Sequence, residues 1–450
     1  MELTPTALNA AALEKEFVWF FRVLESRMQL YFQQETAYAS IFELQAPDLT
    51  EDDSPYARTV RAFDMGLPER LVLLMALTPH VAPELLDIFF TKNSLYERAY
   101  TEFGGLTGRR HVGFLPTGET AVFLLAGGDL YRRFLFTNIF AEEHYFFKHN
   151  ILTLGTDTER EPRLSGALSV SEEYLTRFTA GGVYRPVFSS RFPAERLTTK
   201  LAWEDLVLEE YVRAEVEEIR TWIQHEGDIL ADKELVKRIK PGYRALFYGP
   251  PGTGKSLTAA MLGKVTGRDV YRVDLSQLVS KFIGETEKNL SNIFNQAENK
   301  NWILFFDEAD SLFGKRSETK DAQDRYANQE ISYLLQRIES HPSIILLASN
   351  LKGNIDAAFA RRFQSMIYFP MPDKEQRLRL WKEAFAQHFT LAESVDFAEI
   401  AREHELSGGS VINVLRYCVL VSADRPGRTV TRYDILEGIR REFRKEGRAM

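Results

Sequence analysis

The sequence contains very little cysteine, since Cys418 is the only one among 450 residues. A single thiol excludes an internal disulfide and a cysteine-based zinc cluster, and this scarcity is typical of proteins from a reducing cytoplasm. We therefore expect a cytoplasmic protein in which Cys418, within the apolar segment VINVLRYCVLV, packs into a core.

Long hydrophobic runs are also missing. The longest purely aliphatic stretch near the N-terminus is LVLLMAL at residues 71–77, far short of the ~20 residues that a membrane span needs. The first residues, MELTPTALNAAALEKEF, lack the basic start and apolar core of a secretory signal. The sequence therefore predicts a buried helix around residues 71–77 and no membrane span.

Neither half of the chain carries a surplus of positive charge. Residues 1–200 hold 26 acidic and 20 basic residues, and the remainder hold 38 and 36. Nucleic-acid binding usually requires a basic surface, so this balance disfavours it. A histidine metal site is disfavoured too, because His144 and His149 have no third spaced ligand beyond the neighbouring glutamates.

Residues 1–192 have the pattern of a mainly helical region. Apolar residues recur every three or four positions in LEKEFVWFFRVLESRMQLYFQQE. In residues 109–127 a Pro-Thr-Gly turn separates two apolar runs, which predicts a β-hairpin after the helices. Helices followed by a hairpin indicate a winged-helix-like region. The acidic balance favours docking of a client or partner protein, and Arg109 and Arg110 in the hairpin leave DNA binding as the alternative.

From residue 193 onward, apolar strands alternate with helical patterns. The five candidate strands are ALFYG, DVYRVD, WILFFDEAD, SIILLASN and QSMIYFPMP. This alternation predicts an α/β domain over residues 193–372, with a five-stranded parallel sheet covered on both faces. Only helical patterns follow Pro372, so we expect a small helical lid over residues 373–450.

A glycine-rich octamer, GPPGTGKS, lies between the apolar run ALFY and the helical run LTAAMLGKV. This context indicates a P-loop between a strand and a helix, where glycines let backbone N–H groups converge on phosphates at the helix N-terminus. Lys255 would reach the β- and γ-phosphates, and Ser256 would ligate Mg²⁺. The predicted nucleotide-binding residues here are Gly249, Pro250, Pro251, Gly252, Thr253, Gly254, Lys255, Ser256 and Leu257.

Two further strands end in polar residues suited to phosphate chemistry. The strand ILFFDEAD ends in paired acids, and phosphoryl transfer needs positioning and charge neutralisation more than covalent help. We expect Asp307 to hold Mg²⁺ and Glu308 to orient or polarise the attacking water. The strand IILLAS ends at Asn350, whose amide would bond the γ-phosphate or the water.

Together, GPPGTGKS, FFDEAD, Asn350 and NIDAAFARRF resemble the AAA ATPases, in the clade of the membrane-scission, microtubule-severing and unfolding ATPases. The resemblance covers Leu201 to about Lys445. It implies hydrolysis of ATP with Mg²⁺ in a homo-oligomeric ring, usually a hexamer, with nucleotide bound between neighbouring subunits. It also implies that Arg361 and Arg362 act as arginine fingers on the neighbour's γ-phosphate.

The same resemblance assigns three other groups of residues. SKFIGETEKNL resembles the central pore loop, which would grip an extended polypeptide through Lys281, Phe282, Ile283 and Gly284. The lid segment SGGSVINVL places Gly408 and Gly409 against adenine and ribose, but no arginine stands at its start. WEDLVLEE resembles the adenine-pocket segment, although without the family's usual Gly, and its implied contacts are Asp205, Leu206 and Val207.

The leading hypothesis is a ring-forming Mg²⁺-dependent ATPase that remodels, unfolds or disassembles a protein client recruited by the N-terminal region. The whole chain, including GGVYRPVFSSRFPAERLTTKLAWEDL, is also similar to bacterial AAA ATPases found with extracellular contractile injection systems. The alternative is a nucleotide-dependent scaffold or DNA-associated switch that acts through the winged-helix-like region.

Overall fold

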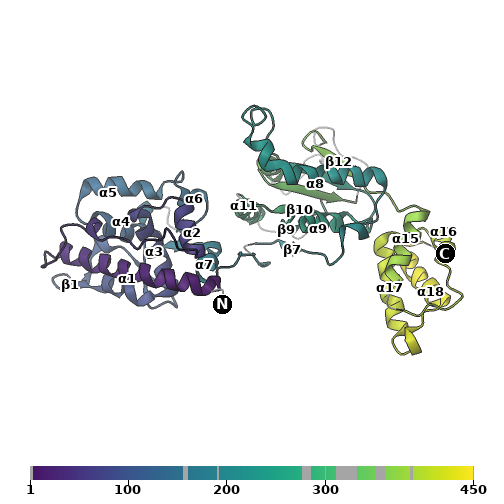
Figure 1. The fold of residues 1–450 in the computed structure, drawn as a ribbon, viewed down its shortest axis with the longest axis horizontal. Coiled ribbons are helices and arrows are strands. Elements are labelled where there is room, and N and C mark those ends of the chain that lie inside the picture. Colours follow the sequence, from purple (N-terminus) through teal and green to yellow (C-terminus); the bar gives the residue numbers. More distant parts are fainter. Residues whose placement is uncertain are drawn as a thin grey trace, which may run out of the picture. The chain divides into compact units, whose positions relative to one another are not determined.

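The computed structural model describes residues 4–155, 161–189, 192–275, 285–298, 300–310, 332–350, 360–385 and 389–448. The chain divides into two compact units, Met1–Arg185 and Pro186–Met450. Figure 1 shows the elements of both units. Each unit has its own apolar core, so each is described by itself below.

The first unit consists mainly of helices. They are α1 (Pro5–Tyr31), α2 (Pro55–Ala62), α3 (Leu67–Val81), α4 (Gly118–Ala126), α5 (Leu130–Thr137), α6 (Tyr145–Lys148) and α7 (Glu172–Thr179). Residues 71–78 of α3 are buried, which confirms the predicted buried helix. Within the described ranges, no single helix has the length and apolar content to cross a membrane, and α3 with the 3₁₀ segment Pro83–Phe90 meets that test only as a pair bent by 106°.

The strands in the described part of the first unit form three short antiparallel pairs. They pair β1 (Lys92–Asn93) with β2 (Arg98–Ala99), β3 (Leu106–Thr107) with β4 (Phe114–Leu115), and β5 (Leu152–Leu154) with β6 (Leu168–Val170). Together with the helices they give a helical region with small β-hairpins.

The predicted hairpin over residues 109–127 is wrong in its second half. The only strand there, β4, ends at Leu115, and α4 begins at Gly118. The Thr117 hydroxyl accepts the N–H of Thr120, and the Thr120 hydroxyl accepts the N–H of Thr117, which is a capping box. Residues 121–126 are all buried, so this apolar run without alternation belongs to a helix, and Pro-Thr-Gly marks the helix start.

The second unit contains a six-stranded sheet in the order β12-β8-β11-β10-β9-β7. All five predicted strands are confirmed and pair in parallel. They are β8 (Tyr243–Tyr248), β9 (Val270–Asp274), β10 (Ile303–Asp307), β11 (Ile344–Ser349) and β12 (Ser365–Tyr368). The sixth strand, β7 (Glu195–Leu197), was not predicted and pairs antiparallel with β9 at the sheet edge.

Helices cover both faces of this sheet. Phe305 of β10 packs into one cluster with Val216 of α8 (Glu210–Ala231) and residues of α9 (Lys255–Thr266). The next residue, Phe306, packs on the opposite face with Phe294 of α11 (Glu285–Ala297) and with the helical residues 332–340. Burial on both faces explains the nearly continuous apolar sequences of the central strands.

In the described part of the chain, four helices follow the sheet, in the region where the sequence predicts a helical lid. They are α15 (Lys374–Phe385), α16 (Phe397–Glu403), α17 (Gly408–Ser422) and α18 (Arg432–Lys445), shown at the yellow end of the chain in Figure 1. They surround a core that includes Trp381 and the fully buried Cys418. The cysteine is therefore a packing residue, as predicted.

Candidate nucleotide-binding site

The glycine loop joins a strand to a helix, as the sequence predicts. β8 ends at Tyr248 and α9 begins at Lys255. At Gly249 (φ +141°), an added Cβ would lie 2.2 Å from the carbonyl oxygen of Phe369; at Gly252 (φ +75°), it would lie 2.4 Å from the Ser407 hydroxyl. Only glycine fits these close approaches without displacing backbone or lid.

The side chain of Lys255 is almost completely buried beneath this loop. Its Nζ donates to the carbonyl oxygens of Gly249 at 2.7 Å and Pro250 at 2.9 Å. Burial lowers the pKa of Lys255 to about 8, although the nearby Asp307 and Asp310 act to raise it. Burial is therefore the main cause of the lowered pKa of Lys255, and a phosphate bound beside Nζ would oppose it.

Asp307 and Glu308 lie at the carboxyl end of β10. One carboxylate oxygen of Asp307, Oδ1, accepts the N–H of Glu308 at 3.0 Å. The other, Oδ2, lies 3.0 Å from Nε of Arg272 on β9. Glu308 has φ +53°, in the left-handed region, where a non-glycine residue bears strain of order 1 kcal/mol. Such strain often occurs at functional sites.

Asp310 fixes the ends of β10 and β11 relative to each other. Its Oδ1 accepts a hydrogen bond from the Ser349 hydroxyl at 2.5 Å and from the N–H of Asn350 at 2.8 Å. The N–H of Ala309 also donates to the carbonyl of Ala348 at 2.8 Å. These bonds bring Asn350 to the same sheet edge as Glu308.

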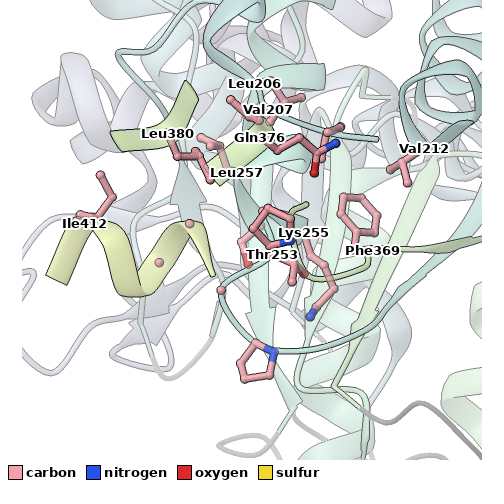
Figure 2. A pocket seen from close by; sticks show the side chains of 18 of the residues that line it. Leu206, Val207, Val212, Thr253, Lys255, Leu257, Phe369, Gln376, Leu380 and Ile412 are labelled. Atoms are coloured by element: carbon pink, nitrogen blue, oxygen red, sulfur yellow. The ribbon is translucent and has the colours of Figure 1, made fainter. Parts of the chain in front are cut away.

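A cavity of 720 Å³ opens over this edge and the glycine loop. Its volume suits a mononucleotide-sized ligand. Fifteen of the predicted nucleotide, metal and catalytic residues line it, namely Asp205, Leu206, Val207, Pro251, Gly252, Thr253, Gly254, Lys255, Ser256, Leu257, Asp307, Glu308, Asn350, Gly408 and Gly409. In Figure 2, Leu206 and Val207 lie across the pocket from Lys255 and Thr253.

The lid closes one side of the cavity. The N–H of Gly409 donates to the carbonyl of Gly252 at 3.0 Å, so the start of α17 rests directly on the glycine loop. Leu380 of α15 and Ile412 of α17 add apolar walls (Figure 2). Arg379 also donates to the carbonyl of Glu204, next to the predicted adenine segment.

Several lining residues were not predicted from the sequence. Phe369 follows β12, Gln376 and Leu380 belong to α15, and Ile412 lies in the first turns of α17. Arg272 was also missed, because its proximity to Asp307 depends on the β9–β10 register. The predicted lid could have indicated the lid residues among these, because a helix that covers a nucleotide is expected to contribute apolar side chains to the pocket.

Some predicted residues lie outside the cavity. Gly249 and Pro250 do not line it, and their carbonyls instead hold Lys255. Arg361 is exposed, and Nε of Arg362 lies 3.8 Å from a carboxylate oxygen of Glu339. The predicted pore loop, Lys281, Phe282, Ile283 and Gly284, falls outside the residues that the structure describes.

The oxygen donors in the cavity fit a magnesium ion held jointly with a phosphate. Ser256 offers a hydroxyl and Asp307 a carboxylate, and Mg²⁺ in phosphate sites typically uses one or two protein oxygens plus phosphate oxygens and water. Within the described ranges no group of three or more His, Cys, Asp or Glu could cage a metal alone. When bound, Mg²⁺ would neutralise phosphate charge.

These features define a P-loop nucleotide-binding domain with a helical lid. Comparison with known families is consistent with this class: residues 245–371 match the family described as "ATPase family associated with various cellular activities (AAA)". Residues 245–371 are therefore similar to an AAA ATPase domain.

Three relatives illustrate the similarity. The chain is 32% identical over 197 residues to Vacuolar protein sorting-associated protein 4B of Mus musculus, covering 43% of this chain and 44% of the relative. It is 34% identical over 179 residues to Protein SUPPRESSOR OF K(+) TRANSPORT GROWTH DEFECT 1 of Arabidopsis thaliana, covering 39% and 41%. It is 30% identical over 250 residues to the Cell division cycle protein 48 homolog of Archaeoglobus fulgidus, covering 54% and 32%. The matches thus span less than half the length of each relative.

Proposed function

We propose that this protein hydrolyses ATP with Mg²⁺ and uses the energy to remodel a protein client. The observation that carries the proposal is the convergence of Lys255, Ser256, Asp307, Glu308 and Asn350 on one cavity beneath a lid. A site that only bound nucleotide would not need an acid beyond the metal ligand, whereas hydrolysis needs a group to orient water.

Each residue has a distinct proposed role. Lys255 and the N–H groups of the glycine loop bind the β- and γ-phosphates. Ser256 and Asp307 hold Mg²⁺, Glu308 orients the attacking water, and Asn350 hydrogen-bonds the γ-phosphate or that water. Asp205, Leu206, Val207, Gly408 and Gly409 contact the base and ribose.

Glu308→Gln tests the catalytic part of this proposal. The amide keeps the size of the side chain but loses the carboxylate charge, so ATP binding should persist while turnover falls about 10²- to 10⁴-fold. Binding is measured with a fluorescent ATP analogue and turnover by phosphate release. Glu209→Gln, which alters another cavity acid, is the matched control and should retain most activity. Near-normal hydrolysis by Glu308→Gln would refute the role of that residue.

We also propose a cytoplasmic homo-oligomeric ring, with six subunits as the expected number. Residues 193–372 and 373–450 would form the ATPase and lid parts, and residues 1–192 would recruit the client. Neither Arg361 nor Arg362 lines the cavity of its own chain, which is compatible with a role on the neighbour's γ-phosphate. Mixing Arg361→Ala subunits with Lys255→Ala subunits should restore some hydrolysis if the finger acts across an interface.

Client remodelling is tested separately through the proposed pore loop. Phe282→Ala should retain basal hydrolysis and lose client processing. The Glu308→Gln form held in ATP should retain a client in a pull-down, and a component of a contractile injection system is the first candidate to test. A client processed normally by Phe282→Ala would remove threading from the proposal.

A further inference from the structure

Two hairpin tips of the first unit expose large apolar side chains. Val112, in the loop between β3 and β4, is 95% exposed; Leu95 and Tyr96, in the loop between β1 and β2, are 78% and 66% exposed. Single exposed apolar side chains are common in folded proteins, whereas several gathered on one part of a domain are candidates for an interaction surface.

The two hairpins share one aromatic base. Phe114 of β4 stacks on Phe89 with ring centroids 5.1 Å apart and meets Phe90 edge-on at 5.6 Å. Phe90 stands two residues before β1. The two loops therefore emerge from neighbouring points on the same unit.

Basic residues surround these tips. Lys92 and Arg98 flank the first loop, and Arg109 and Arg110 lie in the second; all four are exposed. In the part of the chain that the structure describes, no carboxylate lies within ion-pair distance of any of them. Glu97 is the single acid in the two loops, so they carry a local charge of +3 in an otherwise acidic region.

We propose that these two hairpin tips dock the protein on the surface of an anionic lipid bilayer. Basic side chains would face the lipid phosphates while Val112, Leu95 and Tyr96 enter the interfacial layer. Duplex DNA would use the same cations, but most protein contacts to DNA go to phosphate and sugar oxygens, with which exposed aliphatic side chains make no hydrogen bonds.

The test uses the whole 450-residue chain without nucleotide, so its outcome is independent of the proposed ATPase activity. Flotation with vesicles of phosphatidylcholine containing 30% phosphatidylglycerol should recover the protein, and pure phosphatidylcholine vesicles should not. A basic residue near an anionic surface contributes about fivefold in partitioning, so Arg109→Glu/Arg110→Glu should weaken binding at least about 25-fold. Leu95→Ser/Val112→Ser should weaken it about tenfold.

The matched control is Lys15→Glu/Arg58→Glu, which changes net charge equally at exposed positions of α1 and α2. It should bind anionic vesicles nearly as well as the wild type. The proposal is overturned if this control loses binding as strongly as the arginine pair, or if neutral vesicles bind equally. It is also overturned if the chain ignores vesicles but binds duplex DNA with a steep salt dependence. Circular dichroism confirms that the exposed substitutions leave the fold intact.

Discussion

Nucleotide binding should be accompanied by uptake of a proton at Lys255. Among the described residues, its buried ammonium donates hydrogen bonds to the carbonyl oxygens of Gly249 and Pro250, and burial lowers its pKa to about 8. A polyphosphate placed against Nζ favours the charged form and must raise this pKa. The site therefore binds a proton together with the anion wherever Lys255 is partly neutral beforehand.

The size of this uptake depends on pH. With a pKa of about 8, roughly half of the Lys255 side chains are neutral at pH 8, so binding should take up about 0.5 proton per site. At pH 7 about a tenth are neutral, and the uptake should fall to about 0.1 proton. An unburied lysine would remain charged at both values and show no uptake.

Isothermal titration calorimetry with ADP measures this quantity directly. The binding enthalpy is measured at one pH in two buffers of different ionisation enthalpy. The slope of binding enthalpy against buffer ionisation enthalpy gives the number of protons exchanged per site. Lys255→Arg is the control, because a guanidinium stays charged in proteins; if it binds ADP, its slope at pH 8 should be close to zero. A wild-type slope of zero at pH 8 would refute the argument that burial without an anion sets the pKa.

Three other substitutions test the physical basis of the fold and site. Glu308→Gly should raise the free energy of unfolding by up to about 1 kcal/mol in thermal melts, because glycine relieves the backbone strain at φ +53°. The same variant should release no phosphate from ATP. A lower free energy of unfolding than that of the wild type would contradict the strain argument. Arg244→Ala should cost about 3 kcal/mol in urea unfolding, since its buried guanidinium donates to the carbonyls of Ile338 and His341 at 3.0 and 2.7 Å. Bonds from Arg425 and Thr431 lower the pKa of Asp434 to about 2. The contribution of the Asp434 carboxylate to the free energy of unfolding is therefore complete above about pH 4 and is lost as the pH falls toward 2. Asp434→Ala should lower the free energy of unfolding by about 2 kcal/mol at pH 7 and by much less at pH 2.5.

The central strands and the glycine loop could be predicted because their signals are local. An apolar run such as IILLAS must be buried on both sides, and the octamer after β8 has one backbone geometry that suits it. The positions of Glu308 and Asn350 could also be predicted from the sequence, since the carboxyl ends of parallel strands meet at one sheet edge.

Other features depend on contacts that no local pattern encodes. β7 has three residues with little burial, so nothing in its own sequence separates it from a loop. Arg272 reaches Asp307 only through the register of two strands. The Pro-Thr-Gly sequence at the start of α4 suits a turn or a helix cap equally, and tertiary burial of residues 121–126 decides between them.

Two separate requirements explain the glycines of the loop, namely phosphate binding and close packing against neighbouring backbone. Phosphate binding requires N–H groups to converge, but Gly249 is also required because its Cα faces the Phe369 carbonyl beyond β12. Gly252 is required because the lid approaches it, with Ser407 at its Cα and the N–H of Gly409 on its carbonyl. If the loop moves when phosphate binds, its direct contacts require the residue after β12 and the start of α17 to move as well. Within one chain, the motif is therefore in direct contact with the start of α17.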